Sequence, residues 1–218
     1  MKNIIIFTDG SCIGNGQSDA IGGIGIHFPN QELEDISKIY RSGDNCTNQK
    51  TELYAILYAL RYVNKYLGLK NYNILIYSDS DYSINCITKW TNGWIRNGWL
   101  TKNKTPVANR ELIQKIYNYY TKYNIQFQHI EAHTGLTDKN SIANAVADEL
   151  ARKASERAIR EKKIDNGQVL QTFEPEINID NTPIVNNKPR KSYNRSRQNF
   201  NIANGEIDYR QPIDVELI

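Results

Sequence analysis

Residues 3–9 read NIIIFTD, a short apolar run rich in β-branched side chains that ends in Asp9. Its length and composition predict a buried β-strand, along which Asp9 shares one side with Ile5 and Phe7. Residues 72–79 read YNILIYSD and end in Asp79 in the same way. If both strands are parallel and central, both aspartates lie at the edge of an α/β sheet where ligands bind.

The other periodic patterns predict the remaining elements of an α/β domain. Three opening strands with short links indicate an antiparallel meander, and the helices that follow indicate crossovers between parallel strands. We therefore expect a mixed five-stranded sheet with helices on both faces. The expected strands cover residues 3–9, 20–28, 33–40, 72–78 and 125–131, and the expected helices cover residues 47–67, 80–90, 108–123 and 143–158. Glycines in residues 20–28 predict a bulge or a close backbone approach.

The composition changes near residue 159. Residues 160–218 are rich in asparagine and keep neither a helix nor a strand period, which predicts a disordered tail behind a single domain at residues 1–159. Residues 188–197 (KPRKSYNRSR) form a basic patch within this tail. Two interpretations remain open: a solvated tail without a specific role, or a patch that adds nucleic-acid affinity or nuclear import.

Charge and cysteine content narrow the class of protein. The net charge of +3 is too small to indicate a class of binding partner. No apolar run approaches the length of a membrane-spanning helix. The first strand begins at residue 3, which leaves no room for a signal peptide. The three cysteines are odd in number and lack metal-site spacing. We therefore expect reduced thiols and a cytoplasmic or nuclear location.

Two further acids lie where carboxylates are costly. Glu52 continues a core-facing helical stripe, and Asp148 lies among alanines that permit close packing on a sheet. Each of these acids has an alternative interpretation. Asp9 and Asp79 could be N-caps of the segments that follow them, and the charge of Glu52 could simply be favoured by the N-terminus of its helix.

Four acids from four elements could converge on one site. Clustered carboxylates repel one another unless protons or cations neutralise them, and oxygen ligands favour Mg²⁺ or Mn²⁺. The sequence has no Cys/His cluster for zinc and no phosphate-binding glycine loop. Such a site suits in-line displacement at phosphate.

Five motifs occur in order along the chain: TDGS at Asp9, TNQKTELYA around Glu52, YSDS at Asp79, HTG at His133 and NAVADELA around Asp148. Together they resemble type 1 ribonuclease H over residues 1–157. The resemblance implies the ribonuclease H-like sheet, with strand order 3-2-1-4-5 and strand 2 antiparallel.

The resemblance also implies an activity: a Mg²⁺-dependent endonuclease that hydrolyses the RNA strand of RNA·DNA hybrids and leaves 5′-phosphate and 3′-hydroxyl ends. It implies two Mg²⁺ ions, for which Mn²⁺ can substitute, and no small-molecule cofactor. Asp9 and Asp79 would bridge the ions, and Glu52 and Asp148 would complete their shells. We expect a monomer whose partner is the hybrid duplex, with no membrane contact.

The histidines differ in what the resemblance implies for them. His133 matches a flexible-loop histidine that assists proton transfer or product departure. The segment between His133 and Asp148 is longer than in typical members, and Asp138 and Glu149 are the less well placed alternatives to Asp148. His27 and His129 match no catalytic position and are interpreted as surface or packing residues.

Residues 82–110 carry basic residues, no acid, and all three tryptophans, a combination that suits a nucleic-acid backbone. The alternative is core tryptophans with solvated lysines. The resemblance assigns this stretch to the family's basic protrusion and DNA-strand channel, and other positions to a phosphate grip and to minor-groove contacts with 2′-hydroxyls. The residues concerned are Tyr82, Trp90, Trp94 and Lys102 in the channel and protrusion, Thr47 and Asn109 at the phosphate, and Asn15, Asn48 and Gln49 in the groove.

Some assignments have structural alternatives, and two other functions compete with the nuclease. Asn15 could serve a turn and Asn48 a helix cap. A binding module on the same fold without catalysis is the first competing function. A nuclease for duplex RNA or DNA, such as an integrase-type or junction-cutting enzyme, is the second.

Overall fold

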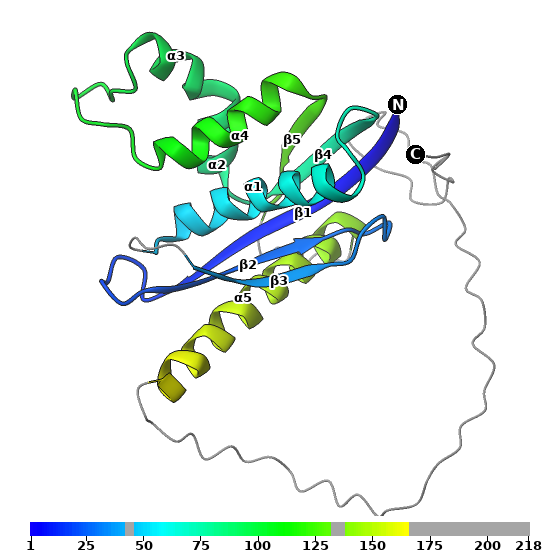
Figure 1. Cartoon of the computed structure of the whole chain (residues 1–218), viewed down its shortest axis with the longest axis vertical. Helices are drawn as coiled ribbons and strands as arrows, with labels where there is room; N and C mark the ends of the chain where they lie inside the picture. Colours follow the sequence, from blue (N-terminus) through cyan, green and yellow to red (C-terminus); the bar gives the residue numbers. More distant parts are fainter. Residues whose placement is uncertain (42–45, 132–137, 166–218) are drawn as a thin grey trace, which may run out of the picture.

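The structure is a computed structural model that describes residues 1–41, 46–131 and 138–165. It contains a five-stranded sheet in the order β3-β2-β1-β4-β5 (Figure 1). The strands are β1 (Lys2–Ile13), β2 (Ile21–His27), β3 (Ile36–Tyr40), β4 (Tyr72–Ser78) and β5 (Ile125–His129). β2 runs antiparallel to β1 and β3, whereas β1, β4 and β5 are mutually parallel. The predicted order and directions are confirmed.

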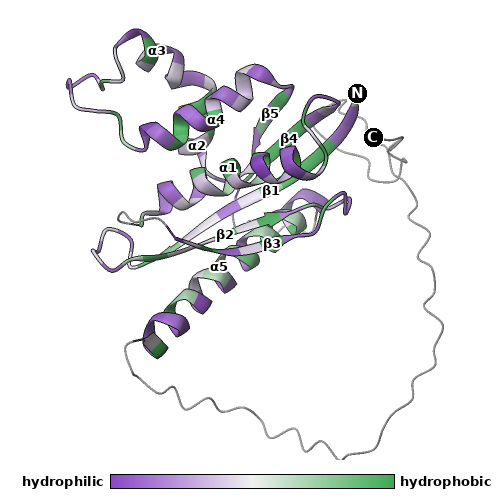
Figure 2. Ribbon diagram, in the orientation of Figure 1, coloured by the Kyte–Doolittle hydropathy of each residue, from purple (hydrophilic) through white to green (hydrophobic). Residues whose placement is uncertain are grey.

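Helices cover both faces of this sheet. α1 (Asn48–Tyr66) and α4 (Arg110–Lys122) pack on the face that receives Ile4 and Ile6 of β1, whereas α5 (Lys139–Asp165) packs on the face that receives Ile5 and Phe7. The alternation along β1 therefore divides the buried side chains into two cores. Figure 2 shows mainly hydrophobic colouring along β4, whereas α4 and α5 alternate between hydrophilic and hydrophobic segments.

The close contact between α5 and β2 explains why β2 is rich in glycine and why α5 is rich in alanine. A Cβ atom on Gly25 would lie 1.9 Å from the carbonyl oxygen of Ala147 and 2.6 Å from the backbone nitrogen of Ala151. Only glycine in the strand and small residues on the helix allow this approach. The close backbone approach predicted for residues 20–28 is thus the one that α5 makes.

The segment between β4 and α4 differs from the single helix predicted over residues 80–90. It comprises α2 (Asp81–Asn85), the π-helical turn η1 (Cys86–Trp90) and α3 (Thr91–Arg96), which projects away from the sheet in Figure 1. The hydroxyl of Thr91 donates to the carbonyl oxygen of Cys86 at 2.6 Å, a partner five residues back that suits a π-helical turn.

α5 is longer at both ends than the predicted helix over residues 143–158. It begins at Lys139 because the carboxylate of Asp138 accepts the backbone N–H groups of Asn140 and Ser141. It continues to Asp165, so the predicted boundary at residue 159 falls within a helix. The rest of the predicted tail, residues 166–218 with the basic patch, lies outside the described residues.

No helix within residues 1–41, 46–131 or 138–165 combines the length and the apolar character that crossing a membrane requires.

Candidate functional site

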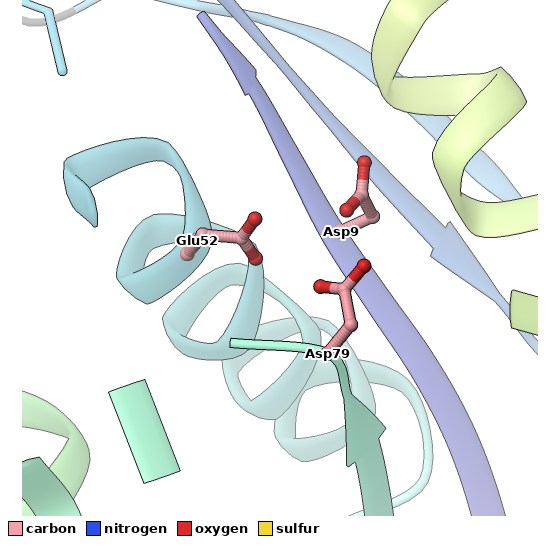
Figure 3. Close-up of side chains that lie close together, drawn as sticks. All are labelled: Asp9, Glu52 and Asp79. Carbon is pink, nitrogen blue, oxygen red and sulfur yellow. The ribbon is translucent and has the colours of Figure 1, made fainter. Parts of the chain in front are cut away.

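Three carboxylates from three elements meet beside the sheet. Asp9 lies on β1, Glu52 in the first turns of α1, and Asp79 directly after β4 (Figure 3). One oxygen of each can be chosen so that all three lie within 4.8 Å of one another. The structure therefore brings together three of the four acids that the sequence singled out.

The ends of two parallel strands explain this meeting. The last paired residues of β1 and β4 are Phe7 and Tyr77, so Asp9 and Asp79 follow at the same edge of the sheet. Gly10 allows α1 to approach this edge, because a Cβ atom there would lie 2.3 Å from the backbone nitrogen of Glu52. Neither the acids nor the glycine alone would place Glu52 beside Asp9.

The environment of these acids disfavours their charged forms. Asp9 and Glu52 are each only 6% exposed, whereas Asp79 is partly buried. Burial first, and then the charges of Asp79 and Asp148, raise the pKa of Asp9 to about 7. Burial and the charge of Asp9 likewise raise the pKa of Glu52 well above its ordinary value, although a hydrogen bond from the Gly10 backbone opposes this.

Asp148 lies near this cluster but outside its 4.8 Å group. It is partly buried on α5, and its charge raises the pKa of both Asp9 and Glu52. The two alternative acids have other partners. Asp138 caps the start of α5, and the carboxylate of Glu149 receives two nitrogen donors of Arg152 at 2.7–2.8 Å. Asp148 is thus the acid on α5 that acts electrostatically on the cluster.

The donor set fits a hard divalent cation. It consists only of carboxylate oxygens, and Oε2 of Glu52 is buried without a hydrogen-bond partner among the described residues. An orphaned buried oxygen of this kind costs free energy unless a cation or a proton satisfies it. Asp9, Glu52 and Asp79 could therefore hold Mg²⁺ or Mn²⁺, with Asp148 alongside.

The predictions made for two histidines have different outcomes. His133 lies outside the described residues. His129, interpreted from sequence as a surface or packing residue, is exposed at the end of β5, and its Nε2 donates to the carbonyl oxygen of Asp79 at 3.2 Å. The parallel register that pairs Ser78 with His129 brings it there. This register was the only signal that could have revealed the contact in advance.

The predicted groove residues gather at the start of α1. The side-chain oxygen of Asn15 accepts the backbone N–H of Asn48 at 3.2 Å. The interpretation of Asn48 as the helix cap is wrong by one residue, because Thr47 is the cap and its hydroxyl accepts the backbone N–H of Lys50 at 3.2 Å. The side chains of Asn48 and Gln49 are exposed beside this cap. Amides therefore face solvent close to the carboxylate cluster.

The predicted channel residues form an aromatic row. Tyr82, Trp90, Trp94 and Trp99 follow one another with ring-centroid separations of 6.2, 5.8 and 6.1 Å. Trp90 is 42% exposed, whereas Trp99 is 7% exposed and belongs to the core, as its alternative interpretation proposed. The side-chain amide of Asn109 donates to the hydroxyl of Tyr82 at 3.2 Å, and Lys102 is exposed in a neighbouring turn.

Comparison with known proteins adds the family context. The family model for RNase H matches residues 1–156. A protein of Acanthamoeba polyphaga mimivirus named as a probable ribonuclease H is 56% identical over 151 residues, which cover 69% of this chain and 66% of that protein. A ribonuclease H of Clostridium botulinum is 36% identical over 154 residues, which cover 68% of this chain and 98% of that protein.

Solved structures show the same fold. The RNase H domain of PFV matches with a TM-score of 0.56 and 24% identity, covering 72% of this chain and 96% of that domain. The foamy viral protease-reverse transcriptase, solved in complex with an RNA/DNA hybrid, matches with a TM-score of 0.56 and 21% identity over 72% of this chain and 20% of that protein. At these identities the likeness concerns the fold alone.

Proposed function

Because this chain belongs to the ribonuclease H family, we propose that it cuts the RNA strand of RNA·DNA hybrids as a divalent-metal-dependent endonuclease. The observation that carries the proposal is the convergence of Asp9, Glu52 and Asp79 within 4.8 Å. Buried carboxylates this close need cations to remain charged, and hydrolysis of a phosphodiester uses such cations.

The proposed chemistry is in-line attack of water at phosphorus, which leaves 5′-phosphate and 3′-hydroxyl ends. Two Mg²⁺ ions, or Mn²⁺ in their place, would activate the water and stabilise the departing oxygen. Asp9, Glu52, Asp79 and Asp148 would supply the carboxylate ligands for these ions, and His133 would assist proton transfer or product departure. Burial and the neighbouring carboxylates raise the pKa of Asp9 to about 7, and the positive charge of a bound cation would lower it.

The proposed choice of a hybrid depends on two sets of residues beside the acids. The exposed amides of Asn15, Asn48 and Gln49 both donate and accept hydrogen bonds, so they can recognise the 2′-hydroxyls of the RNA strand. The DNA strand would lie against the aromatic row, and one of its phosphates would be held by a second pair of residues. These residues are Tyr82, Trp90, Trp94 and Lys102, with Thr47 and Asn109 at the phosphate. We propose that the chain acts as a monomer in the cytoplasm or nucleus.

A substrate panel tests this function. The full chain with Mg²⁺ is given labelled RNA·DNA hybrid, duplex RNA and duplex DNA of one sequence, and the products are resolved on denaturing gels. We expect cleavage of the RNA strand of the hybrid alone. Tight binding of an uncut hybrid would instead indicate a binding module, and duplex DNA cut as fast as hybrid would indicate a nuclease of different specificity.

The variant Asp9→Asn tests the site itself. It removes a charged ligand from the cluster, so we expect a loss of cleavage on the order of a hundredfold or more, with hybrid binding in Ca²⁺ preserved. Asp19→Asn is the matched control, because Asp19 is an exposed aspartate that pairs only loosely with Lys162 at 3.6 Å. Turnover by Asp9→Asn equal to that of Asp19→Asn would remove Asp9 from the metal site.

A further inference from the structure

Two cysteines that are far apart in the sequence are in contact. The Sγ atoms of Cys12, near the end of β1, and of Cys46, just before α1, lie 3.1 Å apart. Both are thiols in this structure, Cys12 partly buried and Cys46 only 4% exposed. A disulfide has an S–S length of about 2.05 Å, so a shift of about 1 Å would join them.

A glycine makes room for this contact. Gly22 of β2 lies opposite Cys12 in the antiparallel register. A Cβ atom on Gly22 would lie 2.6 Å from Sγ of Cys46, closer than real Cβ atoms come to a neighbour. The sheet thus leaves space opposite Cys12 that the second sulfur occupies. The third cysteine, Cys86, is fully buried at the start of η1, in a different part of the fold.

We propose that Cys12 and Cys46 are a redox-active pair that closes to a disulfide when a small-molecule disulfide such as oxidised glutathione is present. The thiolate of Cys12, the more accessible of the two, attacks the small disulfide, forms a mixed disulfide and releases one thiolate. Cys46 loses its proton and attacks the Cys12 sulfur, which releases the second small thiol. The protein loses two protons and two electrons, and the oxidant gains them as two thiols.

The bond would link two segments that the structure already brings together. The side-chain oxygen of Asn15, three residues after Cys12, accepts the backbone N–H of Asn48, two residues after Cys46. Oxidation would thus add a covalent bond beside this hydrogen bond, between the end of β1 and the residues just before α1. This site is a chemical property of the fold and does not depend on the nuclease proposal.

The test is exposure of the native full chain to oxidised glutathione, followed by alkylation, intact-mass measurement and non-reducing peptide mapping. We expect a peptide pair joined through Cys12 and Cys46, alkylated Cys86, and return of both thiols on reduction. The variant Cys86→Ser is the matched control and should form the same bond to the same extent. A disulfide that involves Cys86, or no disulfide at all, would overturn the proposal.

Single variants test the order of attack. In Cys46→Ser the resolving thiol is absent, so glutathione should accumulate on Cys12. In Cys12→Ser the buried Cys46 should remain unmodified over the same time. If Cys46 in Cys12→Ser were modified as fast as Cys12 is in Cys46→Ser, accessibility would not decide which thiol attacks first. The assignment of Cys12 as the attacking thiol and Cys46 as the resolving thiol would then be wrong.

Discussion

At the scale of single residues, Asp9 is where folding and the proposed chemistry oppose each other most directly. It is 6% exposed and faces the charges of Asp79 and Asp148. Without a cation, keeping this carboxylate charged costs the folded state free energy. A cation that binds the folded state alone would recover that free energy and make stability depend on metal concentration.

The pH dependence of stability follows from this arrangement. The pKa of Asp9 is about 7 in the folded protein and near its ordinary value of 3.8 in the unfolded chain. Between these values the folded state binds more protons, so this group lowers the free energy of unfolding as pH rises. We expect Asp9→Asn, in EDTA, to be more stable than the wild type at pH 7 by about 4 kcal/mol and nearly equal to it at pH 4.

Urea unfolding at a series of pH values measures this difference. Asp19→Asn serves as the control and should differ little from the wild type at either pH, because Asp19 is exposed. Mg²⁺ added to the wild type at pH 7 should raise its unfolding midpoint and leave that of Asp9→Asn less changed. A gap between wild type and Asp9→Asn that shrinks as pH rises would contradict the assigned cause.

Trp90 is the exposed member of the aromatic row, at 42% exposure. In the proposed function its ring lies against the DNA strand, so we expect Trp90→Ala to weaken hybrid binding in Ca²⁺ by about 1 kcal/mol. The control is Tyr66→Ala, because Tyr66 is a 55% exposed aromatic at the far end of α1. Hybrid affinity is measured by fluorescence anisotropy. Equal affinities of the two variants would show that Trp90 does not contact the hybrid.

At the scale of elements, the contact between β2 and α5 matters most for the site. Gly25 lies opposite Asp9 in the β1–β2 register, and α5, which carries Asp148, packs directly on it. The separation of helix and strand therefore sets how near Asp148 comes to Asp9. A small change in this packing would therefore alter the distance between Asp148 and Asp9 without a substitution at either residue.

Gly25→Ala tests this packing. Its Cβ atom would lie 1.9 Å from the carbonyl oxygen of Ala147, so we expect the free energy of unfolding to fall by about 1–3 kcal/mol or more. Gly93→Ala is the control, because a Cβ atom there meets nothing within 4 Å and alanine favours helix α3 by up to about 1 kcal/mol. Denaturant unfolding that ranks Gly25→Ala as stable as Gly93→Ala would contradict the close approach.

At the scale of the whole molecule, two ion pairs connect the last turns of α5 to residues next to the strands β2 and β3. Glu161 pairs with Arg41, and Lys162 pairs with Asp19 at 3.6 Å. Both pairs are exposed, and such pairs contribute about 0–1 kcal/mol each. The folded unit therefore extends to at least these residues, although little of its stability depends on them.

Truncation tests where the domain ends. We expect a chain of residues 1–165 to fold and to keep specific activity on hybrid within a few-fold of the full chain. A chain of residues 1–159 should also fold but lose up to about 2 kcal/mol with its two ion pairs. Failure of residues 1–165 to fold, by circular dichroism and urea unfolding, would show that residues 166–218 belong to the domain.

The same truncation addresses the basic patch at residues 188–197. If the patch adds nucleic-acid affinity, the chain of residues 1–165 binds hybrid more weakly, and its affinity depends less steeply on salt. Equal affinity and salt dependence would favour a tail without this role.

Much of this protein could be predicted from its sequence because the determining signals are local. Alternating and helical periodicities located the strands and α1, and the run of elements predicted a mixed five-stranded sheet. The strand order was implied by the resemblance to ribonuclease H, and the structure has that order. The same periodicities marked Asp9, Glu52 and Asp79, since a carboxylate that continues an apolar row stands out wherever that row lies. Asp9 and Asp79 were expected to lie close together because the carboxyl ends of parallel strands meet at one edge of the sheet.

What only the tertiary structure decided depends on contacts between distant segments. The sulfurs of Cys12 and Cys46 meet across 34 positions in the sequence, and His129 reaches Asp79 across 50. α3 was also missed, because it follows a π-helical turn and shows no apolar period of its own. Both the backbone N–H and the hydroxyl of Thr91 donate to the carbonyl oxygen of Cys86 at this turn. Periodicity reports which face of an element is buried, but the distance between two faces is set by packing, and packing involves the whole fold.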